Sequence, residues 1–421
     1  MFYKLTTNIA RVCSLALLAV SATSFTAKAG DWPQWRGPDR TDVSTETGLL
    51  KEWPKDGPKK LWTFDGAGLG YSGYAVVKDR LYTMGILDGK EHLICVDGVK
   101  GAKVWASPIG DILKNNWGDG PRGTPTVDGE FVYALSGQGN LVCASLADGK
   151  VVWTKSLTRD LGGKVPGWGY TESPLVDGDQ VVVTPGGKEG ALAALNKKDG
   201  SVIWQSKEFT DPAHYSSIVA ATINGQKQYV QLVMANFVGI SPKDGKLLWK
   251  SEFPGRTAVI PTPIVADNQV FVTAGYGAGC KSVKIGADNS VTDLYSNKVM
   301  GNHHGGVVKI GDYLYGFAES GGWTCQKFSD GTEVWADKKN FHKGAVSCFD
   351  GMLYCLEEGT GNVALVEPNQ KGWTEKGRFT LEPQTKQRSP SGKVWTHPVV
   401  SNGHLYLRDQ ELISCYDVKA N

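Results

Sequence analysis

The chain has 421 residues, of which 21% are charged and 41% are hydrophobic. This balance excludes an intrinsically disordered chain and a protein with many membrane-spanning helices. The 45 basic and 43 acidic residues nearly cancel, so no basic field is available for binding nucleic acid. The 53 glycines lie well above the usual share of about 7%, which favours a chain rich in turns.

The first 29 residues have the features of an export signal. Lys4 and Arg11 precede an apolar run over residues 12–20, and Ala27-Lys28-Ala29 provides a small-residue cleavage site. A run this short cannot cross about 30 Å of hydrocarbon as a helix. We therefore expect residues 1–29 to be a signal peptide, and the mature protein to be periplasmic or secreted without a membrane span.

From residue 60 onward, Asp-Gly turns followed by a tryptophan recur with a period in the forties. Short β-rich runs separate the copies, and no helical periodicity is visible. Repeats of this length with strand-like content predict four-stranded propeller blades. The tryptophans, with one tyrosine in their place, are Trp62, Trp105, Trp153, Trp204, Trp249, Tyr295, Trp335 and Trp373.

A second column of the repeat marks eight opening strands. They start near Tyr74, Pro125, Pro174, Ile218, Pro263, Val307, Val346 and Pro398. The eighth repeat has no tryptophan after it, whereas segment 60–64, around Trp62, has no repeat before it. If the two pieces share one blade, the ring closes and leaves no open edge. We predict an N-terminal extension over residues 30–59 and one all-β domain over residues 60–421. This domain would be an eight-bladed propeller of four-stranded blades, closed by an N-terminal strand that joins the last blade.

The pattern Asp-x-x-x-Gly-x-x-x-Trp, clearest from Asp97 to Trp105, resembles the tryptophan-docking motif of the pyrroloquinoline-quinone (PQQ) repeat family. The resemblance covers residues 60–418 and implies a PQQ-like propeller whose indoles pack between blades. It also implies two functions, a quinoprotein alcohol or sugar dehydrogenase with PQQ and Ca²⁺, or a non-enzymatic protein-interaction scaffold of the cell envelope. The vicinal cysteines typical of the alcohol-oxidising members are missing, so no catalytic residue is carried over from the family.

The loops that lead into the opening strands carry charged and aromatic side chains. Closure of the ring would gather these loops around one central funnel. Arg122 and Lys343 would repel each other there unless Glu172 or an anion lay between them. We therefore predict a site for a small polar, anionic ligand, formed by Trp117, Arg122, Trp168, Glu172, Arg256, His304, Lys343, Trp395 and His397. An acidic group of a partner protein would meet the same charges.

A cation site is a further hypothesis for the funnel. Glu172, with Asp119 or Asn116, offers the oxygen ligands that Ca²⁺ prefers. An ion pair of Glu172 with Arg122 or Arg256 is the structural alternative. Adjacent residues of a strand point to opposite faces, so we expect only one histidine of the pair that His304 forms with His303 to face the funnel.

Overall fold

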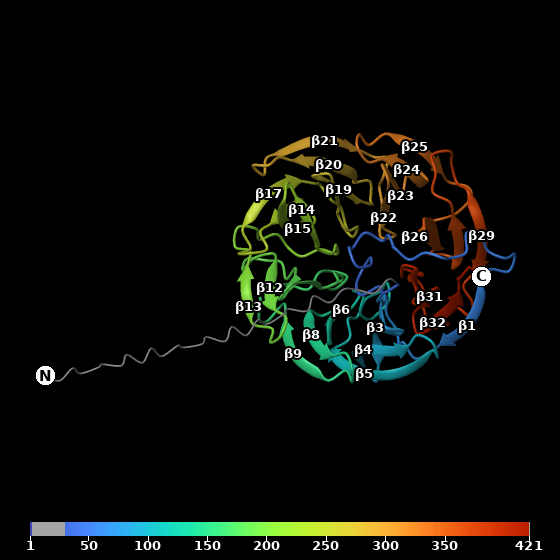
Figure 1. The fold of residues 1–421 in the computed structure, drawn as a ribbon, viewed down its shortest axis with the longest axis horizontal. Coiled ribbons are helices and arrows are strands. Elements are labelled where there is room, and N and C mark those ends of the chain that lie inside the picture. Colours follow the sequence, from blue (N-terminus) through green and yellow to red (C-terminus); the bar gives the residue numbers. More distant parts are fainter. Residues whose placement is uncertain (2–29, 421) are drawn as a thin grey trace.

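The structure, a computed structural model, describes residue 1 and residues 30–420. Eight antiparallel four-stranded sheets stand around a central axis like the blades of a propeller (Figure 1). The predicted eight-bladed fold is therefore confirmed. The predicted signal peptide lies in residues 1–29, which fall outside the described residues apart from residue 1. Among the described residues, no helix has the length and apolar character needed to cross a membrane.

The first four blades follow the chain order from the inner to the outer strand. Blade one comprises β2 (Ala75–Val77), β3 (Arg80–Leu87), β4 (Lys90–Asp97) and β5 (Ala102–Gly110). Blade two comprises β6 (Thr126–Asp128), β7 (Phe131–Leu135), β8 (Asn140–Ser145) and β9 (Val151–Ser156). Blade three comprises β10 (Leu175–Asp177), β11 (Gln180–Val183), β12 (Ala193–Asn196) and β13 (Val202–Gln205). Blade four comprises β14 (Val219–Ile223), β15 (Gln226–Leu232), β16 (Asn236–Ile240) and β17 (Leu247–Glu252).

The next three blades continue in the same way, and the last one differs. Blade five comprises β18 (Ile264–Ala266), β19 (Gln269–Ala274), β20 (Gly279–Ile285) and β21 (Val291–Asn297). Blade six comprises β22 (Val307–Ile310), β23 (Tyr313–Ala318), β24 (Gly322–Lys327) and β25 (Glu333–Asp337). Blade seven comprises β26 (Gly344–Phe349), β27 (Met352–Glu357), β28 (Asn362–Val366) and β29 (Glu375–Thr380). Blade eight combines β30 (Val399–Ser401), β31 (His404–Asp409) and β32 (Leu412–Asp417) with the first strand of the chain, β1 (Lys59–Phe64).

The ring closes through the pairing of β1 with β32. The two strands are antiparallel, and Trp62 lies opposite Cys415. The Trp62 indole nitrogen donates a hydrogen bond of 3.1 Å to the carbonyl oxygen of Gly98 in blade one. The N-terminal strand therefore completes the last blade and also joins it to the first, as the repeat pattern predicts.

Five of the docking side chains pack against the glycine turn of the following blade, namely Trp62, Trp105, Trp153, Trp204 and Tyr295. The nearest heavy atoms to a Cβ placed on Gly149 or Gly200 belong to the indoles of Trp105 and Trp153, at 2.5 and 2.7 Å. Both glycines have positive φ, at +74° and +71°. Glycine is thus required twice, for the left-handed backbone and for the close approach of the ring. The turn and the indole together align one blade on the next.

Trp249 departs from this pattern. Its indole nitrogen donates to the side-chain oxygen of Gln228 in its own blade, at 2.6 Å. The amide of Gln228 then donates to Asn289 of the following blade, at 3.2 Å. The turn of that blade runs from Gly286 to Ser290 and lacks the Asp-Gly pair on which other indoles lie. A glutamine therefore makes the contact between blades that the missing turn cannot make.

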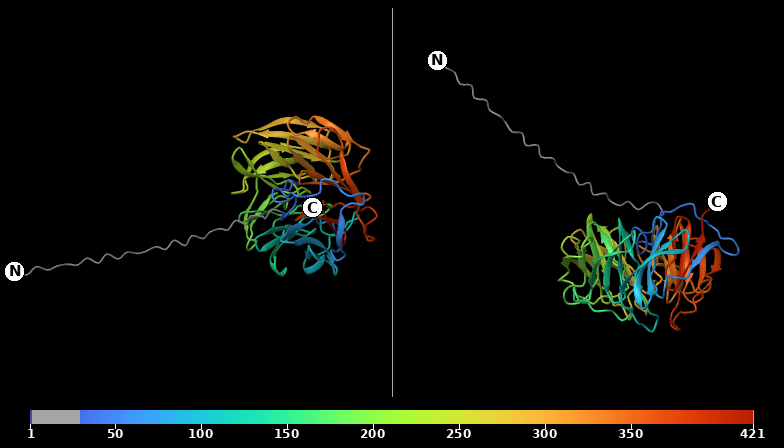
Figure 2. Two further views of the ribbon diagram at one scale, coloured as in Figure 1. Left: turned by 45° about the vertical axis from the view of Figure 1, so that its right-hand side comes forward. Right: turned by 90° about the horizontal axis from the view of Figure 1, so that it is seen from below.

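Residues 31–46 of the N-terminal extension form a strap that touches all eight blades. In Figure 1 the blue segment crosses the centre of the ring, and in the edge-on view of Figure 2 it lies on one face. Trp32 exchanges two backbone hydrogen bonds with Val76 of blade one. The other blades are reached at Val127, Ser173, Ile218, Thr262, Val307, Cys348 and Asn402.

Three buried charged residues anchor the strap. Arg40 donates to the carbonyl oxygens of Ser173, Pro174 and Ile218, at 3.1, 2.5 and 2.8 Å. Arg36 donates to the Val307 carbonyl at 2.7 Å and lies 3.1 Å from the carboxylate of Asp42. These guanidinium groups satisfy carbonyl oxygens near the starts of the inner strands, which would otherwise lack partners. The strap is thus part of the core.

Candidate functional site

A cavity of about 450 Å³ opens at the centre of the ring, and we call it the cup. Its walls come from the loops of all eight blades, and its lining includes Trp35 and Arg36 of the strap. Seven of the nine side chains predicted for the funnel line the cup, although they are scattered along the chain. These are Trp117, Arg122, Trp168, His304, Lys343, Trp395 and His397.

Glu172 and Arg256 do not line the cup. Thr171 and Ser173 line it, and Glu172 between them points away, into a buried space beside Arg40. There its carboxylate accepts a hydrogen bond from the backbone nitrogen of Thr184. Burial raises the pKa of Glu172 to about 7, although the hydrogen bonds of Thr184 and the charge of Arg40 oppose this shift. Arg256 is exposed to solvent in the loop between β17 and β18.

The three predicted calcium ligands have separate partners. Glu172 is held by Thr184, while Asp119 accepts from the Lys114 ammonium at 2.8 Å. Asn116 is exposed, and its backbone carbonyl accepts from the Ser389 hydroxyl at 2.9 Å. Within residues 30–420, no cluster of three or more His, Cys, Asp or Glu side chains is placed to hold a metal ion. The predicted Ca²⁺ ligand set is therefore not assembled.

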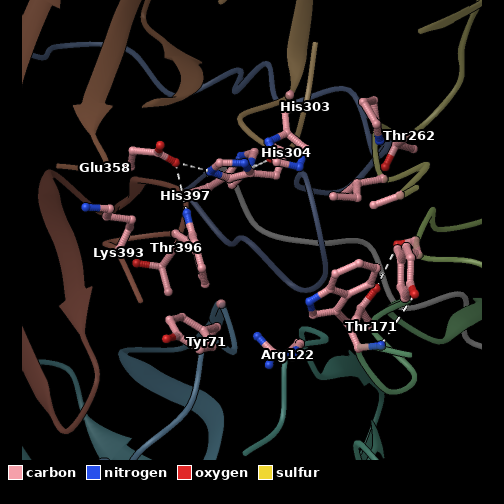
Figure 3. Close-up of a pocket in the computed structure, with 18 of the residues that line it drawn as sticks. Tyr71, Arg122, Thr171, Thr262, His303, His304, Glu358, Lys393, Thr396 and His397 are labelled. Atoms are coloured by element: carbon pink, nitrogen blue, oxygen red, sulfur yellow. Dashed lines mark hydrogen bonds and ion pairs between the residues drawn. The ribbon is translucent and has the colours of Figure 1, made fainter. Parts of the chain in front are cut away.

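One side of the cup is a hydrogen-bonded polar cluster built around Glu358 (Figure 3). Its carboxylate lies 2.8 Å from Nε2 of His304 and accepts from the Trp395 indole at 2.9 Å. The ammonium of Lys343 lies 3.7 Å away. Burial alone would raise the pKa of Glu358, but these donors and charges outweigh it and hold that pKa well below its usual range. The carboxylate is thus ionised and already engaged.

Both neighbouring histidines line the cup, so the expectation that only one would do so is wrong. His303 and His304 lie in the loop that precedes β22, where the alternation of a strand does not apply. Lys343 donates to Nδ1 of His303 across 2.6 Å. Burial, together with the charges of His304 and Lys343, lowers the pKa of His303 to about 3. Burial also lowers the pKa of His304, so both rings are neutral near pH 7.

The opposite side of the cup is aromatic and contains Arg122. The guanidinium lies 4.9 Å from the ring centre of Tyr71 and donates to the Gly118 carbonyl at 2.7 Å. Its Nε atom is buried and has no hydrogen-bond partner in the described chain. Trp117, nearly half exposed, packs on Trp395, with ring centres 6.4 Å apart. The buried Nε is out of reach of a ligand, but no described residue accepts from Nη1. This wall thus offers apolar ring faces beside a cation with free Nη1 donors.

The strap lines the cup where sequence reasoning proposed no role for it. The indole of Trp35 donates to the Thr262 hydroxyl at 2.9 Å, and its ring centre lies 4.7 Å from that of His397. His397 in turn lies 3.6 Å from Asp42, the partner of Arg36. The position of Trp35 therefore depends on the buried Arg36–Asp42 pair.

Sequence reasoning also missed both carboxylates of the cup. Glu358 follows β27 and Glu319 follows β23, so each lies in the hairpin between the second and third strands of its blade. Antiparallel strands bring these hairpins to the same face as the loops that lead into the inner strands. The sequence feature that could have revealed these carboxylates is an acidic residue in such a hairpin. The prediction considered only the loops before the inner strands.

The cup does not fit the ion that PQQ requires. Its two carboxylates are engaged, Glu358 by His304, Trp395 and Lys343, and Glu319 by the backbone nitrogen of Tyr276 at 2.6 Å. A quinone that carries three carboxylates would also meet these two negative groups. Ca²⁺ needs several free oxygen ligands, which this arrangement does not provide. No catalytic step that uses PQQ follows from this geometry.

Comparison with known proteins shows the family to which this chain is related. A family profile described as the outer membrane protein assembly factor BamB matches residues 89–337, more than half of the chain. BamB of Yersinia pestis is 22% identical over 396 residues, which cover 87% of this chain and 90% of that protein. BamB of Shewanella oneidensis is 23% identical over 247 residues, 56% of each chain.

Solved structures show the same ring. The crystal structure of BamB from Moraxella catarrhalis matches with a TM-score of 0.60 at 14% identity, covering 86% of this chain and 98% of that one. Quinohemoprotein alcohol dehydrogenase from Comamonas testosteroni matches with a TM-score of 0.62 at 11% identity, covering 94% and 81%. Identities this low show a shared fold and not a shared activity. On the strength of the profile match, the chain belongs to the BamB family of PQQ-like β-propellers.

Proposed function

We propose that this protein is an exported binding protein of the cell envelope, whose cup holds a small ligand with a negatively charged group. The observation that carries the proposal is the Arg122 guanidinium, which lines the cup over Tyr71 and makes one hydrogen bond, from Nη2 to Gly118, among the described residues. The export signal expected over residues 1–29, and relatives named as outer membrane assembly factors, support a place in the cell envelope.

The charges of the cup favour an anion with a small number of charges. Arg36 is neutralised by Asp42, which leaves Arg122, Lys343 and Lys393 against Glu319 and Glu358. Lys343 is itself close to Glu358, at 3.7 Å. The positive charge that remains for a ligand is therefore concentrated at Arg122 and at Lys393 on the exposed rim. One acidic group, rather than several, matches this surplus.

The test compares acids with neutral counterparts of the same shape. Three pairs of compounds are titrated into the purified full chain by calorimetry: benzoate with benzamide, glutamate with glutamine, and glucuronate with glucose. PQQ is titrated as a polyanionic probe. At least one acid is expected to bind tenfold or more tightly than its neutral counterpart. Arg122→Gln should remove that preference without changing the melting temperature by more than a few degrees. Equal binding of all acids and neutral counterparts, or no binding, overturns the proposal.

Docking of a partner protein is a second candidate function. The relatives are named as assembly factors, and the outer strands of adjacent blades two and three expose apolar side chains. Val152 on β9 is 48% exposed and Ile203 on β13 is 45% exposed. Crosslinking through cysteines placed at these two positions tests this candidate. A partner captured there, and lost when both positions carry lysine, would support it, whereas no specific crosslink would count against it.

A further inference from the structure

The two sides of the cup would bind different chemical groups of one ligand. The side around Arg122 offers a positive charge and the Nη1 donors, while the side around Glu358 and Glu319 offers carboxylate oxygens that only accept hydrogen bonds. A second acidic group of a ligand would be repelled by these carboxylates. A hydroxyl group could donate to them. The cup therefore matches a ligand that is acidic at one end and hydroxylated at the other.

The histidines extend the hydroxyl-binding side. His303 and His304 are neutral near pH 7, so their rings can donate from one nitrogen and accept at the other. Nε2 of His304 faces Glu358 at 2.8 Å, and Nδ1 of His303 accepts from Lys343 at 2.6 Å. Glu319 lies beside them, with its carboxylate 3.9 Å from His303. Neutral rings beside carboxylates suit a ligand with several hydroxyl groups.

The walls between these two sides are ring faces. Trp117, Trp395 and Tyr71 form one group, with the rings of Tyr71 and Trp395 centred 4.9 Å apart. Trp168 packs edge-on against Tyr215 at 5.6 Å. An indole face provides a flat, weakly negative surface on which the slightly positive C–H groups of a saturated ring can lie. The combination of ring faces and paired hydrogen-bond acceptors selects a polyhydroxylated ring over a simple aliphatic acid.

We infer that the ligand of the cup is a sugar acid of one or two rings, with its carboxylate at Arg122 and its hydroxyl groups at Glu319, Glu358 and the neighbouring histidines. This inference rests on the proposed function and names the class of ligand for the same site. The cavity of about 450 Å³ lies in the lower part of the range found for small-molecule pockets, which suits one or two rings. A planar aromatic acid would satisfy Arg122 and the indoles but would bring no hydroxyl donor to Oε1 of Glu358 and of Glu319, whose nearest side-chain nitrogens lie 3.7 and 3.9 Å away.

The experiment measures binding of four probes to the purified full chain by calorimetry. Glucuronate and cellobiouronate, each with one carboxylate, are the acidic sugars, cellobiose is the neutral sugar, and benzoate is the acid without hydroxyl groups. An acidic sugar is expected to bind at least tenfold more tightly than both cellobiose and benzoate. Arg122→Gln should lower the affinity for the acidic sugar at least tenfold and leave the weak binding of cellobiose unchanged.

Glu319→Gln separates this inference from the general binding of anions. The carboxylate of Glu319 would accept hydrogen bonds from ligand hydroxyl groups. Its replacement should therefore lower the affinity for the acidic sugar several-fold, while benzoate binds equally well or better. Glu189→Gln, an exposed acid that does not line the cup, is the matched control and should change neither probe. Tighter binding of benzoate than of any sugar acid overturns this inference and leaves the proposed function intact. Failure of every acid to bind overturns both.

Discussion

At the scale of single residues, the chain buries charged groups in two different ways. Arg36 and Asp42 neutralise each other at 3.1 Å, and both are almost fully buried. Glu172 has only a distant charge partner in Arg40 and a hydrogen bond from a backbone nitrogen. Burial without a close ion pair favours the neutral carboxyl, which explains why the pKa of Glu172 rises while that of Glu358, surrounded by donors, falls.

Glu172 should make the stability of the protein depend on pH. Its pKa is about 7 in the folded protein against an ordinary value of 4.5, so between these pH values the folded state holds a proton that the unfolded chain has lost. The contribution of Glu172 to the free energy of unfolding should therefore decrease as the pH rises from about 4.5 to 7, by on the order of 3 kcal/mol, while the lowered pKa of His303 and of His304 contributes in the opposite direction. Glu172→Gln should remove this decrease, as measured by urea unfolding at several pH values. The exposed Glu189→Gln should keep it, and an unchanged pH profile in Glu172→Gln would contradict the assignment.

The packing of an indole on a glycine turn can be isolated with two alanine substitutions. Gly200 and Gly225 both have positive φ, at +71° and +77°, so alanine costs similar backbone strain at each. A Cβ at Gly200 would lie 2.7 Å from Trp153, whereas nothing lies within 4 Å of a Cβ at Gly225. Gly200→Ala should therefore destabilise the protein by about 1–3 kcal/mol more than Gly225→Ala, as measured by urea unfolding. Equal losses would show that the indole does not pack on this turn.

At the scale of elements, the strap connects the stability of the core to the shape of the cup. It has no copy of the repeat, yet its arginines occupy carbonyl oxygens from blades three, four and six. The same segment brings Trp35 to the cup. A change in the anchoring of the strap should therefore affect both stability and ligand binding.

Removal of one partner of the buried pair tests this connection. Asp42→Ala would leave Arg36 charged and buried, which should cost about 3–5 kcal/mol in the free energy of unfolding. It should also weaken binding of any acid that the cup accepts, because Trp35 and His397 lose their common support. Asp39→Ala, an exposed position on the same strap, is the control. The double variant Arg36→Leu with Asp42→Leu should recover part of the lost stability. Equal stability of Asp42→Ala, Asp39→Ala and the double variant would exclude an anchoring role of the Arg36–Asp42 pair.

At the scale of the whole molecule, closure joins residues that lie more than 300 positions apart. β1 and β32 share one sheet, so the outer edge of the last blade is formed by the start of the chain. Without β1 that sheet would present the unpaired backbone groups of β32 and lose the docking indole of Trp62. Propeller rings depend on this contact because it leaves no long open edge.

Replacement of residues 59–64 by glycine and serine in equal number tests closure without shortening the chain. The loss of Trp62 from its turn alone should cost about 3–5 kcal/mol, and the exposed edge of β32 should promote self-association. The melting temperature by circular dichroism should fall strongly, and light scattering should detect association at micromolar concentration. A variant that melts unchanged and stays monomeric would show that the eighth blade is complete without β1.

The sequence by itself determined the repeat, the number of blades, the closing strand and seven of the side chains that line the cup. These features follow from local periodicity, because the repeats share the same turn chemistry and most docking side chains meet the glycine turn of the next copy. The tertiary structure alone decided the direction of Glu172, the pairing of His303 and His304 with Lys343 and Glu358, and the place of the strap. Side-chain direction depends on the exact backbone of a loop, which has no period. The strap, as a segment that occurs once, could reveal its role only where its arginines meet carbonyl oxygens of distant blades.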